Sequence, residues 1–325
     1  MSDEPKRDLP PAFDPALLDA PHRDPDGSFF NPWGRLPVKF LDVLRWKLGP
    51  NEYRGRPKPP VPFVRNDGAY LSRPDEPDSI TSVGHATFAI HDRGEIVLTD
   101  PHWSARALVP KRLHPPGLPV ETVERAAFAV VSHDHYDHLD DATVRRLPEG
   151  LPWFVPPGLG GWFSRRGRRA IELDWWQSAT HGRWTVTAFP VQHWSRRTFR
   201  VNRTLWTGWL LDSGTRRYLF AGDSGAFGGF AEIGRRLAPI DVAFLPIGAY
   251  EPRWFMAYQH MDPAEAYRAF LDLGAKFMVP MHWGVFDLTD EPVGLAPHVL
   301  AEHLATIGGD PRVRTLAIGE RWVLP

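Results

Sequence analysis

The sequence predicts a layered α/β fold for most of the chain. From residue 80 onward, apolar runs of strand length alternate with turns and helix-forming segments. The apolar run 126–131 ends directly in polar side chains, and three later runs end in the same way. In layered α/β proteins, functional groups gather where strand ends converge. One helix is clearly delimited, because Asp262 can cap it, Pro263 suits its first position and Gly274 can end it.

The other elements follow from the same patterns in chain order. Short apolar runs bounded by turn residues predict strands at 80–83, 87–90, 95–99, 126–131, 151–155, 170–173, 184–189, 242–246, 276–280 and 313–318. Residues 205–211 and 217–220 are expected to pair as a hairpin across Ser213 and Gly214. A further helix is expected around 297–307.

The first 79 residues are expected to form a proline-rich extension that wraps the domain formed by residues 80–325. The first 80 residues hold 15 of the 34 prolines, and proline lacks the backbone donor that a central strand or helix interior needs. Within the extension, 37–49 predicts a short helix. Two interpretations of this helix are open. It could touch lipid, since basic residues flank Trp46, or it could dock on its own domain, which we favour.

Composition excludes several classes of protein. The chain has no cysteine, so disulfides, thiolate ligands and a cysteine nucleophile are excluded. A formal net charge of −1 argues against a nucleic-acid partner. No signal peptide is evident at the start, and no apolar run approaches the roughly 20 residues that cross a bilayer. We expect a cytoplasmic protein, with contact to a peripheral membrane surface left open.

The stretch after residue 131 carries the densest set of metal-competent side chains. His133, His135, Asp137 and His138 fall within six consecutive positions. In an extended loop alternate residues point the same way, so His133 and His135 can converge on one ion while Asp137 and His138 reach a second. A histidine-rich surface loop is the alternative, and the density of nitrogen and oxygen donors disfavours it.

Three distant residues complete the predicted donor set. His193, Asp223 and His282 each follow an apolar strand. Five histidines and two aspartates are too many for one tetrahedral ion and suit two ions that share a carboxylate. The predicted ligands are His133, His135 and His193 for the first ion, Asp137, His138 and His282 for the second, and Asp223 as the bridge.

This donor pattern resembles the metallo-β-lactamase superfamily. Longer segments resemble one family within it, the N-acylphosphatidylethanolamine-hydrolysing phospholipases D, at residues 174–176, 192–194, 221–223, 246–256, 258–260 and 282–284. The similarity spans 29–320, and the run 246–256 is its most specific part. The resemblance implies a four-layer αββα sandwich, two zinc ions (Zn2+) per chain, a homodimer and a membrane-associated protein.

The same resemblance implies a phosphodiesterase of the phospholipase D type. Its substrate would be N-acylphosphatidylethanolamine or a related glycerophospholipid, and its products phosphatidic acid and an N-acylethanolamine. Elementary chemistry agrees, because two zinc ions lower the pKa of bound water to about 7 and so supply hydroxide without a serine or cysteine nucleophile. Asp137 could orient or deprotonate that water, and by family analogy His260 positions the phosphate or protonates the leaving oxygen.

Other residues receive supporting roles. Asp100 is expected to hold a ligand imidazole, as carboxylates near metal sites often do. Arg196 and Arg197 follow His193 closely enough to help hold an anionic head group. Substrate contacts are also expected from Gln259, which lies in the resembling segment 258–260, and from Trp254 and Trp283 beside an acyl groove. Large core residues are the alternative for the two tryptophans.

Two other functions remain open at this point. A metal-dependent lactonase or esterase-type hydrolase of a small soluble substrate would use the same ligands, so only substrate profiling would separate it. A metal-binding, lipid-sensing scaffold without activity is disfavoured, because it has no need of a complete ligand set for an open metal pair.

Overall fold

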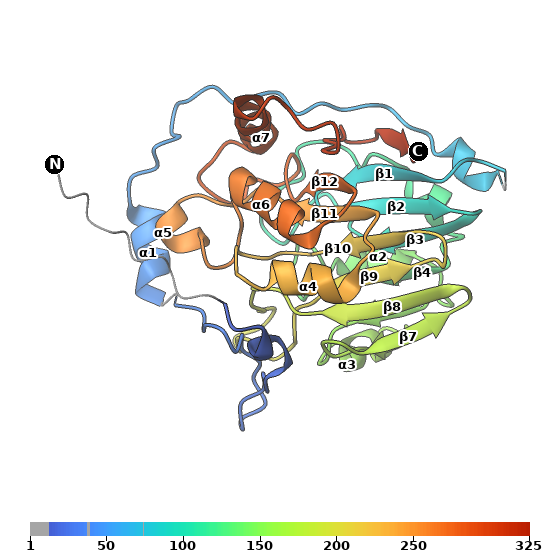
Figure 1. Cartoon of the computed structure of the whole chain (residues 1–325), viewed down its shortest axis with the longest axis horizontal. Helices are drawn as coiled ribbons and strands as arrows, with labels where there is room; N and C mark the ends of the chain where they lie inside the picture. Colours follow the sequence, from blue (N-terminus) through green and yellow to red (C-terminus); the bar gives the residue numbers. More distant parts are fainter. Residues whose placement is uncertain (1–12, 38–39, 74) are drawn as a thin grey trace.

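The computed structural model describes residues 13–37, 40–73 and 75–325, and its core is two β-sheets packed face to face (Figure 1). Within these residues the first sheet has seven strands, in the spatial order β13 (Arg321–Val323), β1 (Ser79–Gly84), β2 (Thr87–Asp92), β3 (Glu95–Thr99), β4 (Phe128–Val130), β5 (Trp153–Val155) and β6 (Ala170–Glu172). The second sheet has six strands, in the order β12 (Phe277–Met281), β11 (Val242–Pro246), β10 (Arg217–Phe220), β9 (Gly208–Asp212), β8 (Trp184–Phe189) and β7 (Ser178–His181).

Helices cover the outer faces of both sheets. The α-helices are α1 (Phe40–Leu48), α2 (Asp141–Arg146), α3 (Gly160–Ser164), α4 (Phe230–Leu237), α5 (Arg253–Met256), α6 (Pro263–Leu273) and α7 (Leu295–Thr306), and short 3-10 helices occur at Pro15–Asp19, Ala69–Ser72 and Val120–Val123. Helices α2 and α3 pack on the first sheet, and α4 and α6 pack on the second. The predicted four-layer αββα sandwich is confirmed.

Alternate residues of a strand point to opposite faces of its sheet and so contribute to two different hydrophobic clusters. Phe128 and Val130 of β4 join the cluster between the sheets, whereas Ala129 and the next residue after the strand, Val131, join the cluster beneath α2 and α3. A strand covered on both faces reads as one continuous apolar run. This is why 126–131 looks uniformly apolar in the sequence.

Strand direction brings the functional loops to one edge. In the first sheet β1 and β3 are both antiparallel to β2, and β4 is parallel to β3. In the second sheet β8 and β10 are both antiparallel to β9, and β11 and β12 are parallel to β10. The carboxyl ends of β1, β3 and β4 therefore lie at one end of their sheet, as do those of β8, β10, β11 and β12.

Local sequence sets the limits of α6 as predicted. The Asp262 carboxylate accepts from the backbone of Glu265, whose own side chain accepts from the backbone of Asp262. Gly274 ends the helix in the left-handed conformation at φ 64°.

The strand predicted at 313–318 is wrong, because this segment divides its backbone pairing between two neighbours. Val313 forms one parallel bridge with Met278, and Ile318 forms one with Phe63. The C-terminal strand is instead β13, which pairs antiparallel with β1. Gly319 lies between the two segments at φ 86°, where a glycine turns the chain without strain.

Helix α1 both docks on the domain and exposes apolar side chains. The Trp46 ring stacks on Phe255, and its Nε1 donates to Asp290 Oδ1 at 2.9 Å. Leu41 and Leu48 are 73% and 84% exposed, and Leu44 is also exposed. No described helix is long and apolar enough to cross a bilayer. The domain boundary at residue 79 stays a prediction.

Candidate metal centre

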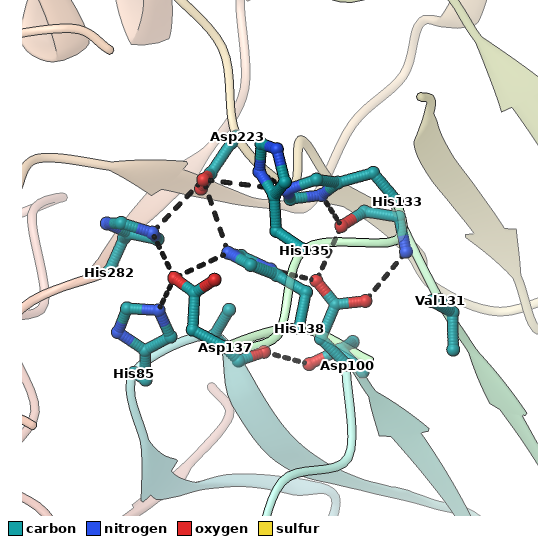
Figure 2. A network of polar contacts seen from close by, with 12 residues as sticks. His85, Asp100, Val131, His133, His135, Asp137, His138, Asp223 and His282 are labelled. Atoms are coloured by element: carbon teal, nitrogen blue, oxygen red, sulfur yellow. Dashed lines mark hydrogen bonds and ion pairs between the residues drawn. The ribbon is translucent and has the colours of Figure 1, made fainter. Parts of the chain in front are cut away.

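Strand ends deliver all seven predicted ligands to one place. Figure 2 labels each of them except His193. The loop after β4 supplies four of them, and the loops after β8, β10 and β12 supply His193, Asp223 and His282. The predicted ligands fall into two groups, and a third group joins Asp223 and His282 to His260. Within each group the candidate ligand atoms lie within 4.8 Å of one another. Such a clustering of histidine and carboxylate groups is typical of a metal site.

The first group contains the predicted ligands of the first ion together with Asp223. His135 Nδ1 lies 2.8 Å from His133 Nε2 and 3.2 Å from His193 Nε2. At most one of two facing imidazole nitrogens can donate a proton to the other. A cation can instead accept a lone pair from all three rings, so their convergence favours a metal.

The second group contains Asp137, His138 and His282, and the structure adds His85. Asp137 Oδ2 lies 3.5 Å from His138 Nε2, 3.4 Å from His282 Nε2 and 2.9 Å from His85 Nε2. His85 is absent from the ligands predicted above. Its signal was nevertheless present, because it directly follows the buried strand β1 as the predicted ligands follow their strands.

Asp223 lies between the two groups. Its Oδ2 is 3.8 Å from His133 Nε2 and 3.7 Å from His193 Nε2. The same oxygen is 3.2 Å from His138 Nε2 and 3.1 Å from His282 Nε2. This is the position that a carboxylate shared by two ions would occupy.

Neighbouring residues hold the ligand rings in orientation. His138 Nδ1 donates to Asp100 Oδ2 at 2.6 Å, in the role expected of Asp100. Ser132 Oγ donates to the same carboxylate and lies 2.9 Å from His133 Nδ1. His193 Nδ1 donates to the carbonyl oxygen of Gln259 at 3.0 Å. Each contact engages the outer nitrogen of a ring, so the inner nitrogen faces the centre.

The residues fit metal ions on the evidence of their unpaired atoms. His138 Nε2, His282 Nε2 and Asp223 Oδ1 are buried and have no hydrogen-bond partner among the described residues. Buried polar atoms rarely stay unpaired unless an ion or water is bound to them. Imidazole and carboxylate donors without thiolates suit zinc and neighbouring divalent metals.

The backbone at the centre is also strained. His85, Asp100 and His282 have positive φ angles of 61°, 34° and 64°. Such conformations are unfavourable for residues other than glycine and persist where the surrounding structure enforces them, commonly at functional sites.

Buried carboxylates keep protons on two of the ligand imidazoles. Burial lowers the pKa of His138, but Asp223, Asp137 and Asp100 outweigh it and raise that pKa well above its usual value. Burial also lowers the pKa of His282, but Asp223 and Asp137 outweigh it and raise that pKa to about 9. In the absence of metal, the two protonated rings balance the negative charge of the buried carboxylates, as a bound cation would do.

We expect metal binding near pH 7 to release protons, because a ligand imidazole must be neutral. The raised pKa values of His138 and His282 predict about two protons per chain. Conversely, His282 stabilises the metal-free fold below its ordinary pKa of 6.5, and this contribution is lost as the pH rises through about 9. Calorimetric zinc titrations in two buffers of different ionisation enthalpy measure the release. Zinc binding without proton release at pH 7 would contradict the prediction.

A groove of about 410 Å³ opens onto the metal ligands. Four of the predicted substrate or catalytic residues line it, namely Asp137, Arg196, Gln259 and His260. His260 Nδ1 lies 3.9 Å from Asp223 Oδ2, and burial lowers the pKa of His260 to about 3. The ring is therefore neutral, which suits a hydrogen-bonding role better than proton donation to a leaving group.

Three other residues predicted to bind substrate lie outside this groove. The Arg197 guanidinium donates to the carbonyl oxygens of Asp134 and Leu139, so it stabilises the loop after β4 that carries the candidate ligands. Trp283 is buried in the core, where its Nε1 donates to the Pro280 carbonyl. Trp254 is 51% exposed, carries the Arg45 guanidinium over its ring and lines a separate pocket. Packing rather than substrate accounts for the contacts of Arg197 and Trp283.

Comparison with known proteins agrees with the fold and the site. A family model described as "Beta-lactamase superfamily domain" matches residues 95–283. A metallo hydrolase of the archaeon Ignicoccus hospitalis has a similar fold, with a TM-score of 0.60 and 23% identity over 77% of this chain and 99% of that one. Fold and site thus define a metal-dependent hydrolase of the metallo-β-lactamase superfamily.

Sequence relatives narrow the assignment. The chain is 37% identical to an N-acyl-phosphatidylethanolamine-hydrolyzing phospholipase D of Caenorhabditis elegans, over 74% of each chain. It is also 37% identical to an uncharacterized protein of Mycobacterium tuberculosis, over 83% of this chain and 76% of that one. The chain belongs to the family of the N-acyl-phosphatidylethanolamine-hydrolyzing phospholipases D.

Proposed function

We propose that this hydrolase uses two zinc ions to cleave N-acylphosphatidylethanolamine, or a related glycerophospholipid, at the phosphodiester bond on the head-group side. The observation that carries the proposal is a pair of ligand groups, joined by Asp223, at the base of a groove with apolar walls. The products are phosphatidic acid and an N-acylethanolamine. The name of the C. elegans relative supports the same choice of substrate.

The groove combines the two properties that a phospholipid requires. Its base carries Asp137, Asp223 and His282 from the metal centre. Its walls include apolar side chains from separate parts of the chain, namely Val43, Trp46, Leu108, Val109, Trp194, Phe255, Met256 and Leu288. Acyl chains can bury apolar surface against these walls, while the phosphate reaches the polar base.

The chain's own residues have defined tasks in this reaction. Two zinc ions, when bound, supply an activated water and the positive charge that stabilises an in-line displacement at phosphorus. In this proposal Asp137 orients that water, and the neutral His260 ring hydrogen-bonds a phosphoryl oxygen. The water oxygen bonds to phosphorus, the bond from phosphorus to the ethanolamine oxygen breaks, and that oxygen takes up a proton.

Hydrolysis in ¹⁸O-labelled water tests the bond that breaks. The purified, zinc-loaded chain is incubated with N-acylphosphatidylethanolamine in mixed micelles, and the products are identified by mass spectrometry. We expect N-acylethanolamine without label and phosphatidic acid with one ¹⁸O, because water attacks phosphorus. Labelled free fatty acid would indicate an esterase. No lipid turnover beside rapid lactone hydrolysis would favour the alternative hydrolase.

We further propose that the mouth of the groove contacts a membrane surface from which the lipid enters. Leu108 and Val109 line the groove and are 60% and 73% exposed. The exposed Leu41 and Leu48 belong to α1, whose Val43 and Trp46 line the same groove. These apolar side chains, together with the basic residues that flank Trp46, suit the interface of an anionic bilayer.

Vesicle binding tests this contact separately from catalysis. In co-sedimentation with phosphatidylcholine vesicles that contain phosphatidylserine, we expect the Leu41→Glu/Leu48→Glu double variant to bind roughly 10-fold more weakly than the unaltered chain, because it loses two exposed leucines. Ile307→Glu is the matched control, since Ile307 is 52% exposed after α7 and lines none of the groove. Equal binding by all three proteins would contradict the membrane contact.

A further inference from the structure

His85 is a buried residue of the centre that the proposed reaction does not yet use. Its Nε2 lies 2.9 Å from Asp137 Oδ2, and its ring lies 4.1 Å from that of His282. Its carbonyl oxygen accepts the backbone N–H of His282 at 3.0 Å. His85, the first residue after β1, thus contacts two candidate ligands of the second group. It contacts Asp137 through its side chain, and His282 through both its ring and its backbone.

The contacts of Asp137 indicate what His85 does. Three imidazoles approach its Oδ2, those of His85, His138 and His282. Once a cation is bound by His138 and His282, their Nε2 atoms are ligands and can no longer donate to the carboxylate. His85 is then the imidazole, among the described residues, that is left to donate a hydrogen bond to Asp137.

We propose that His85 is a positioning residue that orients Asp137 and thereby sets the affinity of the second metal position, without being a ligand itself. The inference rests on the proposed two-metal site. Residues that hold a ligand carboxylate or imidazole typically contribute 10–100-fold to metal affinity. The effect should be confined to one ion, because His133, His135 and His193 make no contact with His85 in the structure described.

The backbone of His85 explains why the residue can hold this position. It has φ 61°, which is unfavourable for a residue other than glycine, and Gly84 before it has φ 118°, which a glycine adopts without strain. A Cβ on Gly84 would approach Val285 Cγ2 to 2.9 Å, so a larger residue there would force either the turn or the Val285 side chain to shift. The fold keeps the imidazole against Asp137 at this local conformational cost.

Zinc titration of the metal-stripped full chain, in competition with a chromophoric chelator, tests the proposal without any lipid. We expect His85→Ala to weaken the second zinc equivalent by about 10–100-fold and to leave the first unchanged. His85→Gln should keep most of the affinity, because its amide N–H can donate to Asp137. His91→Ala is the matched control, since His91 is buried in β2 at the far end of the same hairpin.

The outcomes separate this inference from the proposed function. An unaltered chain that binds one zinc ion would overturn the two-metal site and the role of His85 with it. Two zinc ions in the unaltered chain, with both equivalents weakened alike or neither weakened in His85→Ala, would overturn only the role of His85. A His85→Gln variant as weak as His85→Ala would show that the imidazole is itself a ligand. Thermal unfolding of the metal-free variants excludes misfolding as the cause.

Discussion

Asp223→Asn is expected to reduce lipid hydrolysis by on the order of 10³-fold and to lower bound zinc below two ions per chain. The Asp223 carboxylate faces both ligand groups, with its Oδ2 within 3.8 Å of the Nε2 atoms of His133, His138, His193 and His282. An asparagine amide is neutral and presents one oxygen, so it cannot hold two cations as a carboxylate does. Initial rates on micellar substrate and elemental analysis measure the two effects.

Asp241→Asn provides the matched control for this substitution. Asp241 directly precedes β11, at the end of the second sheet opposite to the ligands, and accepts from the backbone of Arg217 and from Lys276. Loss of the Asp241 carboxylate should affect the stability of the fold without changing the amount of zinc bound per chain. Full turnover by a folded Asp223→Asn variant would remove Asp223 from the bridge.

Removal of the metal is expected to abolish hydrolysis and to lower the melting temperature by roughly 5–10 °C. Ions that bind the folded chain tightly and the unfolded chain weakly stabilise the fold by about 3–4 kcal/mol at 100–1,000 times their dissociation constant. Without them, the buried inner atoms of His138, His282 and Asp223 lose their partners. Chelator treatment, dialysis and differential scanning calorimetry give the measurement, and added zinc should restore both properties.

The Asp223→Asn variant also serves this second experiment. Because it binds metal poorly, chelation should change its melting temperature less than that of the unaltered chain. An unaltered chain that loses all its metal with no change in melting temperature would indicate that the ligand groups are stable by themselves.

Local features of the sequence predicted much of the fold and brought together a set of candidate ligands. Capping residues delimit α6, because side-chain hydrogen bonds at a helix end involve residues close in sequence. Ligands at strand ends were predictable because parallel strands deliver their carboxyl ends to one edge. The loop after β4 adds four candidate ligands within six positions, a density that other local roles do not explain.

Features that depend on distant contacts were not predictable in this way. The sequence pattern contained His85 after a strand, but its approach to Asp137 depends on the packing of β1 beside the loop after β4. Arg197 and Trp283 were expected near substrate and instead hold the loop and the core, because their orientation is set by carbonyl groups they meet only after folding. The segment 313–318 does not form the predicted strand, because its backbone pairs with two different neighbours, one at each end.

By itself, the sequence predicted most of the strands, the helix at 263–273 and a set of seven candidate ligands, and it excluded thiolate chemistry, because these depend on residue type and short-range spacing. The tertiary structure decided which ligands face each other, which residue supports Asp137 and which apolar side chains wall the groove. Those relations are distances between segments far apart in the chain, and only the packing of the two sheets and of α1 sets them.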